Sequence, residues 1–421
     1  MAEDSTSSAD PTQPPVYPEP GRPPRSGYRE VLAVREFRAI FVAHVLSVLG
    51  GVLAEVSLAV LVFRRTHSAL LTALVFAFGF LPYALSGVTL SGIADRRPPR
   101  RVLVTCDLLS AACVAVMAVP ALPVPVLFIP RFAVAMISPL FTGTRAASLA
   151  DILSEDLYVL GRSLIRIVSQ SAQVVGYGLG GLALVWLSPR TALCVTTVTF
   201  VSSSLLLRLG TRDRPARVTQ AGALTRASTR SALALLSDRQ IRVLLLMWWV
   251  PPMFFVVAEG VAAPFADASG AGTAGFGLFL AAMPAGTVVS ETLTATLVAP
   301  AARDRLVSPL MTLSLFPMIA FGTHPSLPIA AALMLLTGLC AGYTLGIDRW
   351  FVQAVPEGAR GQAMSLLGAG MMTLQGVGMT VGGAVATLIP PYLVICTAGL
   401  LGSVTILGVL HLTHNQHVHS A

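Results

Sequence analysis

The chain has 421 residues, of which 54% are hydrophobic and only 11% charged, and its mean hydropathy is +0.76. Soluble proteins carry about 25% charged residues, so this composition excludes an ordinary soluble protein and requires lipid as the solvent. The net charge of +8 comes entirely from arginines that lie between apolar runs, which favours contact with anionic lipid headgroups over binding to nucleic acid.

Twelve apolar runs follow one another along the chain. They cover residues 38–62, 70–94, 101–120, 124–146, 160–187, 190–208, 241–266, 273–299, 305–322, 327–350, 360–388 and 391–412. Each is close to the roughly 20 residues that a helix needs to cross the hydrocarbon core of a bilayer. Period-two alternation is absent, and backbone groups in lipid must be satisfied internally, so we expect an all-α membrane protein with twelve transmembrane helices.

Polar segments divide the chain into two halves. Residues 1–27 are rich in Ser and Pro and predict a disordered tail, and residues 209–240 form the longest polar connection. Six-helix halves are therefore expected at 28–208 and 241–412, followed by a short tail at 413–421. The arginines gather in the N-terminal segment and in the even-numbered connections, which lie on the same side of the membrane as both termini; this predicts that the termini and the linker are cytoplasmic.

An internal repeat relates the two halves. When the sequence is shifted by 204 residues, Glu55 falls on Glu259 and Arg145 falls on Arg349. With a shift of 202 residues, glycines of the fifth span fall on glycines of the eleventh. Two parallel six-helix repeats joined by a linker are typical of transporters whose halves rock about a central site near the middle of the bilayer.

A short, proline-broken turn between the second and third spans carries a basic cluster. It reads Ser91-Gly92-Ile93-Ala94-Asp95-Arg96-Arg97-Pro98-Pro99-Arg100-Arg101. This turn resembles the D-R-x-G-R-R motif of the major facilitator superfamily, although Ser91 and Pro98 stand where glycines are expected. The fifth span carries Gly176-Tyr177-Gly178-Leu179-Gly180-Gly181, which resembles the G-P-x-x-G-G motif of the same superfamily, with Tyr177 at the usual proline.

The resemblance extends from about residue 28 to about residue 412 and is greatest to bacterial drug and secondary-metabolite exporters. It implies two pseudo-symmetric six-helix halves, multi-pass insertion in the bacterial cell membrane, and alternating access. It also implies that Asp95 latches onto the eleventh span when the cytoplasmic side closes. The expected latch residues are Asp95, Arg96, Arg100, Arg101 and Asp107. The alternative is that this charged turn is only a solvated topology signal.

Charged residues inside the spans are costly and mark candidate sites. Glu55 and Glu259 lie at equivalent depths in the outer half of the first and seventh spans, where they could carry protons or attract a cationic substrate. Arg131 in the fourth span resembles a third motif of the superfamily. Glu291 in the eighth span is expected to face the cavity or the eleventh span. The alternative is that the acids are hydrated near the outer rim or paired with nearby arginines.

Glycines in the fifth and eleventh spans allow another helix to approach closely. The candidate helix-packing glycines are Gly176, Gly178, Gly180, Gly181, Gly378, Gly382 and Gly383. Two interpretations remain open for them, a sliding surface between the halves and tight static packing.

Together these features predict a secondary transporter that exports a small amphipathic compound, such as a drug or secondary metabolite, in exchange for protons. We expect a monomer whose partners are the bilayer, the small-molecule substrate and protons, with no nucleic acid, cofactor or metal. The chain has no lysine and no G-x-x-x-x-G-K-[ST] loop, which disfavours direct drive by ATP. The alternatives are an importer, an exporter of a siderophore or other metabolite, and a transport-inactive membrane sensor. A membrane enzyme is disfavoured because no nucleophile–base set emerges.

Overall fold

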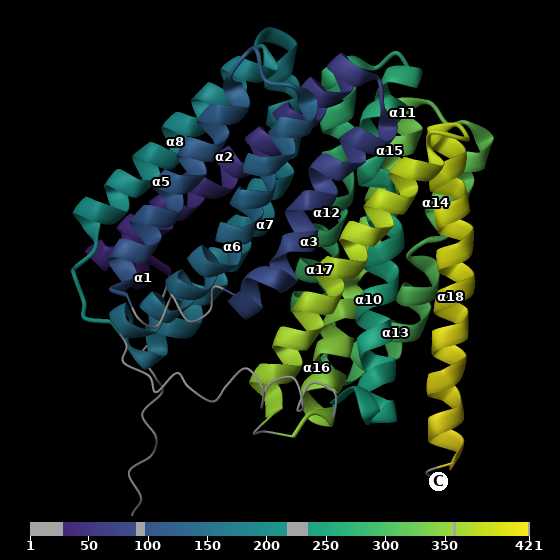
Figure 1. Cartoon of the computed structure of the whole chain (residues 1–421). Coiled ribbons are helices and arrows are strands. Elements are labelled where there is room, and N and C mark those ends of the chain that lie inside the picture. Colours follow the sequence, from purple (N-terminus) through teal and green to yellow (C-terminus); the bar gives the residue numbers. More distant parts are fainter. Residues whose placement is uncertain (1–27, 90–96, 217–234, 357–358, 420–421) are drawn as a thin grey trace, which may run out of the picture.

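The structure is a computed structural model that describes residues 28–89, 97–216, 235–356 and 359–419. Within these ranges every regular element is a helix (Figure 1). The first half of the chain contains α1 (Tyr28–Ala33), α2 (Arg35–Thr66), α3 (Ala69–Thr89), α5 (Pro99–Ala118), α6 (Val124–Ile152), α7 (Glu155–Trp186) and α8 (Pro189–Gly210). The second half contains α10 (Arg239–Gly260), α11 (Ala262–Ala268), α12 (Gly272–Leu297), α13 (Pro300–Leu313), α14 (Phe316–Ile319), η1 (Ala320–Thr323), α15 (Leu327–Leu339), η2 (Cys340–Tyr343), α16 (Thr344–Ala354), α17 (Arg360–Val385) and α18 (Pro391–His419).

Ten helical segments of the described chain are long and apolar enough to cross a membrane. α3 adds a shorter apolar run over Ala69–Tyr83. α7 is 32 residues long, but Arg162, Arg166 and Gln173 interrupt its apolar sequence. With these two helices, the described residues hold helices at all twelve predicted spans, the second of them described as far as Thr89, and the all-α membrane fold is confirmed.

Three predicted spans are broken rather than continuous. The seventh ends as α10 at Gly260 and resumes as the short helix α11, the ninth divides into α13, α14 and η1, and the tenth into α15, η2 and α16. The break in the tenth has a visible cause, because the Gly342 N–H donates to Ser290 Oγ of α12 at 3.0 Å. A hydrogen bond from a neighbouring helix thus replaces one in the α-helical ladder and favours a 3₁₀ turn.

The helices pack into two bundles that contact each other along two helix pairs. In the first half α2 packs on α7 and α8, and α5 packs on α6 and α8. In the second half α10 packs on α17 and α18, and α12 packs on α15. The pairs α3–α17 and α7–α12 join the halves, and both lie between the bundles in Figure 1.

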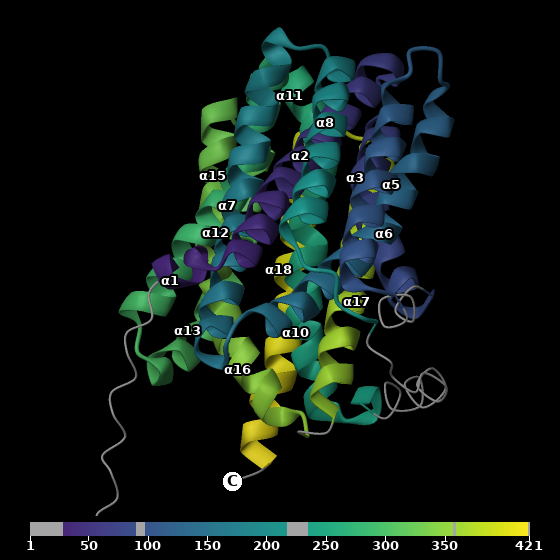
Figure 2. The same ribbon diagram turned by 90° about the vertical axis from the view of Figure 1, so that its left-hand side faces the viewer.

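The two ends of the bundle differ. We call the end that carries α1, the start of α5 and the end of α18 the terminal face, and the end that carries α11 the opposite face (Figures 1 and 2). α11 contacts α2 and α3, so the halves touch near the opposite face. The ribbons of the two halves diverge toward the terminal face in Figure 1.

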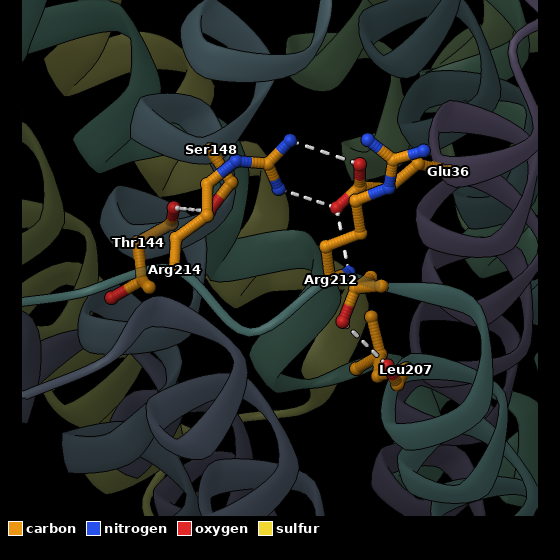
Figure 3. A network of polar contacts seen from close by, with 7 residues as sticks. Glu36, Thr144, Ser148, Leu207, Arg212 and Arg214 are labelled. Carbon is orange, nitrogen blue, oxygen red and sulfur yellow. Dashed lines mark hydrogen bonds and ion pairs between the residues drawn. The ribbon is translucent and has the colours of Figure 1, made fainter.

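A polar network ties the segment after α8 to α2 at the terminal face (Figure 3). Arg214 forms an ion pair with Glu36 through both guanidinium NH₂ groups, and the Arg212 backbone N–H donates to the same carboxylate at 2.9 Å. The hydrogen bonds that Arg214 donates to Glu36 raise the pKa of Arg214, so this contact persists at any physiological pH. Ser148 and Thr144 of α6 lie beside it, joined by a hydrogen bond of 2.8 Å.

Candidate functional site

A cavity of about 350 Å³ lies inside the first half, lined by side chains from α2, α3, α5, α6, α7 and α8. Its polar lining residues form two clusters. The cluster nearer the opposite face contains Glu55, Arg131, Gln173 and Tyr177, and the cluster nearer the terminal face contains His44, Ser47, Asp107 and Arg145.

Glu55 and Arg131 form an ion pair between α2 and α6. Their side chains are 17% and 13% exposed, and Arg131 Nε also donates to the Val75 backbone carbonyl of α3 at 2.8 Å. Gly79 of α3 faces the pair, since a Cβ at that position would lie 3.2 Å from Glu55 Oε1 and would collide with the guanidinium. The lack of a side chain at residue 79 therefore leaves room for the pair.

Glu259 approaches this pair from the other half. It is half-buried near the end of α10, interacts electrostatically with Glu55, and shares with Glu55 an electrostatic interaction with the buried Tyr177 hydroxyl. The ion pairs among described residues do not include Glu259. The two acids related by the sequence repeat thus interact electrostatically across the two halves, and Arg131 is paired to Glu55.

Asp107 lies in the second cluster. It is 2% exposed and accepts hydrogen bonds from Ser203 at 2.5 Å and from Ser47 at 3.2 Å. The sequence placed Asp107 in a surface network with the latch arginines, but its partners lie inside the first half, on α8 and α2. Arg100 and Arg101 instead line a separate groove at the terminal face.

Two latch residues, Asp95 and Arg96, lie outside the described residues, so the latch stays a prediction. The sequence analysis assigned no role to Ser47 and Ser203, the hydrogen-bond partners of Asp107.

His44 and Arg145 form the buried centre of the second cluster. Their exposed fractions are 3% and 8%, and the Arg145 guanidinium contacts His44 Nδ1. Because a guanidinium only donates, Nδ1 must be the acceptor and Nε2 must carry the hydrogen. Nε2 lies 2.8 Å from Ser169 Oγ, and the Ser169 hydroxyl donates its hydrogen to the Ile165 carbonyl at 2.9 Å. Ser169 Oγ is therefore the acceptor for Nε2–H, which agrees with a neutral His44 protonated at Nε2.

Sequence reasoning missed His44, and the helical period could have found it. His44 precedes Glu55 by 11 residues on α2, and Arg131 precedes Arg145 by 14 residues on α6. At about 100° per residue both separations place the two side chains on one face of their helix. Each helix therefore presents a charged or titratable residue to each cluster, His44 and Glu55 from α2, Arg145 and Arg131 from α6.

Glu291 pairs with Arg166 across the two halves. The distance from Arg166 to Glu291 Oε2 is 3.6 Å, and Thr344 Oγ1 lies 3.5 Å from Glu291 Oε1. The sequence placed Glu291 in the cavity or against the eleventh span, whereas its described partners lie on α7 and α16. This contact joins α7 to α12.

The predicted glycines form two sets, which we call registers: those that face a helix of their own half and those that face a helix of the other half. The same division holds on α7 and on α17. On α7, Gly176 and Gly180 face Val52 and Val56 of α2; on α17, Gly378 and Gly382 face Met253 and Val257 of α10. These contacts lie within one half. Gly181 instead lies against Gly277 of α12, and Gly383 lies against Ala73 of α3, so both pack against the other half. Gly178 also points toward the other half, with Ala281 of α12 as its neighbour.

Comparisons with known proteins agree with this architecture. A crystal structure of a POT family transporter in complex with 5-aminolevulinic acid has a TM-score of 0.72 at 10% identity, covering 90% of this chain and 96% of that one. The peptide transporter POT in complex with sulfate gives 0.68 at 12% identity, with 93% and 98% covered. A bacterial homologue of the iron transporter ferroportin in the inward-facing state gives 0.63 at 16% identity, with 89% and 98% covered.

At these identities the likeness shows a shared fold alone. A comparison with curated protein sequences finds no match. The family model of the Major Facilitator Superfamily matches residues 40–308, which is more than half of the chain. The twelve spans, the paired bundles and this match lead to one conclusion: the chain belongs to the Major Facilitator Superfamily.

Proposed function

We propose that this membrane transporter works by alternating access and exports a small amphipathic compound, a drug-like molecule or secondary metabolite, in exchange for protons. The observation that carries the proposal is the electrostatic interaction of Glu259, from the second half, with Glu55, which is paired with Arg131 in the first half. The described ion pairs join Arg131 to Glu55 and do not include Glu259, so one of the two negative charges is left uncompensated, and an uncompensated charge inside a membrane is costly. Binding a proton removes that cost, and losing it restores the charge.

The conformation supports the same proposal. The halves touch near the opposite face, where Gly181 meets Gly277 and Gly383 meets α3, and they diverge toward the terminal face. With the terminal face in the cytoplasm, as the arginine distribution predicts, this is an inward-open state. Glu55 and Glu259 then sit at the closed end, where a change of their charge alters the contact that must open.

The test is proton movement in energised everted membrane vesicles challenged with hydrophobic cations and antibiotics. We expect at least one compound to collapse the pH gradient with the wild-type protein, and Glu55→Gln or Glu259→Gln to abolish the response. Asp267→Asn is the matched control, because Asp267 is an exposed acid at the opposite face. A response that survives in both glutamine variants would overturn the assignment of these acids.

A further inference from the structure

Four arginines surround a groove of about 600 Å³ at the terminal ends of α5 and α8. The charged lining residues are Arg97, Arg100, Arg101, Arg208 and Asp213. Four arginines and one aspartate give this groove a net charge of +3. The ion pairs among the residues that the structure describes include none of the four guanidinium groups. Among the described residues, the groove therefore offers four cationic side chains and only one anionic side chain, Asp213.

The groove is lined by residues of α5, of α8 and of the segments beside their terminal ends, and these two helices lie on the outer side of the first half. α5 and α8 form this outer side, as Figures 1 and 2 show together. Arg101 and Arg208 are both exposed. The position is separate from the cavity that holds Glu55 and Arg131, so this site goes beyond the proposed transport function.

Apolar stripes continue from the groove along both helices. On α5, Leu108 follows Arg101 by seven residues and therefore lies on the same helical face, with 46% of it exposed. On α8, Leu205 and Val201 precede Arg208 by three and seven residues and are 53% and 45% exposed. A cationic groove at the membrane boundary thus leads directly into an apolar surface that faces hydrocarbon.

We propose that this groove binds the phosphate headgroup of an anionic glycerophospholipid, whose acyl chains lie along the apolar stripes of α5 and α8. Arginine suits this ligand, because its planar donors match phosphate oxygens in pairs. Basic clusters at the membrane boundary attract anionic lipids in general. The apolar stripes favour a lipid headgroup over a free phosphate ion as the ligand, because a free phosphate ion would make no favourable contact with the exposed apolar surface beside the arginines.

Native mass spectrometry of the purified full-length chain tests the proposal. The protein in detergent is titrated with phosphatidylglycerol and, separately, with phosphatidylcholine of identical acyl chains. We expect one phosphatidylglycerol to bind about tenfold or more tightly than phosphatidylcholine, and this preference to fall as the ionic strength rises from about 0.05 M to about 0.3 M. Equal binding of the two lipids would overturn the proposal.

Charge variants locate the site. Each arginine near a phosphate contributes about a fivefold change in affinity, so Arg101→Gln with Arg208→Gln should weaken phosphatidylglycerol binding about 30-fold. The matched control is Arg38→Gln with Arg239→Gln, which removes two exposed arginines from the same face outside the groove. An equal loss in both double variants would assign the effect to total charge and contradict a localised site.

A third variant is expected to gain affinity. Asp213→Asn removes the acid from the groove lining and should tighten phosphatidylglycerol binding about fivefold, so the proposal remains testable if the double variant fails to fold. A competition arm adds inorganic phosphate in large excess. Displacement of the lipid by phosphate at low millimolar concentration, or weaker lipid binding by Asp213→Asn, would overturn the lipid assignment.

Discussion

At the scale of single residues, the Glu55–Arg131 pair shows how a charged site is kept inside a membrane. Neither side chain is fully buried, and each has a second interaction. Arg131 donates a hydrogen bond to the Val75 carbonyl, and Glu55 interacts electrostatically with Glu259. The guanidinium is the natural partner, because it remains protonated under all physiological conditions. The pair thus fixes one of the two acids and leaves Glu259 as the acid with the greater freedom to change its charge.

Removing Arg131 should destabilise the protein more than removing the whole pair. Arg131→Gln leaves Glu55 uncompensated, and we expect a loss of about 1–3 kcal/mol in unfolding free energy, below the 3–5 kcal/mol of fully buried pairs because both partners are partly exposed. Arg131→Gln with Glu55→Gln should recover at least half of that loss. Denaturant unfolding in detergent micelles measures both values. Arg64→Gln, an exposed control, should stay within about 0.5 kcal/mol of wild type.

The His44 contacts predict a specific tautomer. Nitrogen-15 spectra of histidine-labelled protein, with His44→Gln to assign the signal, should show an unprotonated Nδ1 and a protonated Nε2. Ser169→Ala removes the acceptor of Nε2–H and should cost about 1–3 kcal/mol of stability, because a buried donor then has no partner. A protonated Nδ1 in the wild-type spectrum would contradict the contact with Arg145.

At the scale of helices, the crossing of α7 and α12 depends on two glycines that meet backbone to backbone. A Cβ on Gly181 would lie 2.7 Å from the Gly277 backbone nitrogen, whereas a Cβ on Gly178, three residues away on the same helix, would lie 3.8 Å from the Ala281 Cβ. The first distance is a collision and the second an ordinary contact. These two positions therefore form a matched pair for one experiment.

Gly181→Ala should weaken the closed contact at the opposite face, and Gly178→Ala should not. Overpacking costs about 1–3 kcal/mol, which changes the ratio of two conformations by about 5- to 150-fold. Spin labels at residues 188 and 274 of a cysteine-free chain report the separation of the two helix ends by pulsed electron paramagnetic resonance. Identical distance distributions in both variants would show that backbone proximity at this crossing does not control the state.

At the scale of the whole molecule, Arg166 and Glu291 form an ion pair between the halves. Arg166 is 64% exposed, so the pair contributes at most about 1 kcal/mol and is weakened by salt. Arg166→Glu should shift the balance between the two conformations by fivefold or less, and the swap Arg166→Glu with Glu291→Arg should restore it. Single-molecule fluorescence between the halves measures the balance. Arg162→Gln on the same helix is the control, and failure of the swap to restore the balance would exclude a direct pairing.

The sequence allowed us to predict properties of individual helices, such as their length and the residues they carry, but not contacts between helices. Apolar length gave the twelve spans, and the repeat indicated that Glu55 and Glu259 occupy equivalent places. The sequence alone could not predict which side chains pair with each other. The contacts of Asp107 with Ser203 and of Glu291 with Arg166 join helices that are distant in the chain. The same limit explains the interrupted tenth span, whose break depends on Ser290 of another helix.

The two glycine registers have a genetic consequence. Substitutions at Gly176, Gly378 or Gly382 strain a contact inside one half, and their carriers should lose protein from the membrane. Substitutions at Gly181 or Gly383 strain only the seam between halves that are each intact, and their carriers should keep normal protein levels while losing turnover. A random screen that scores protein abundance and transport separately would therefore divide the glycines of α7, and again those of α17, into two phenotypic classes.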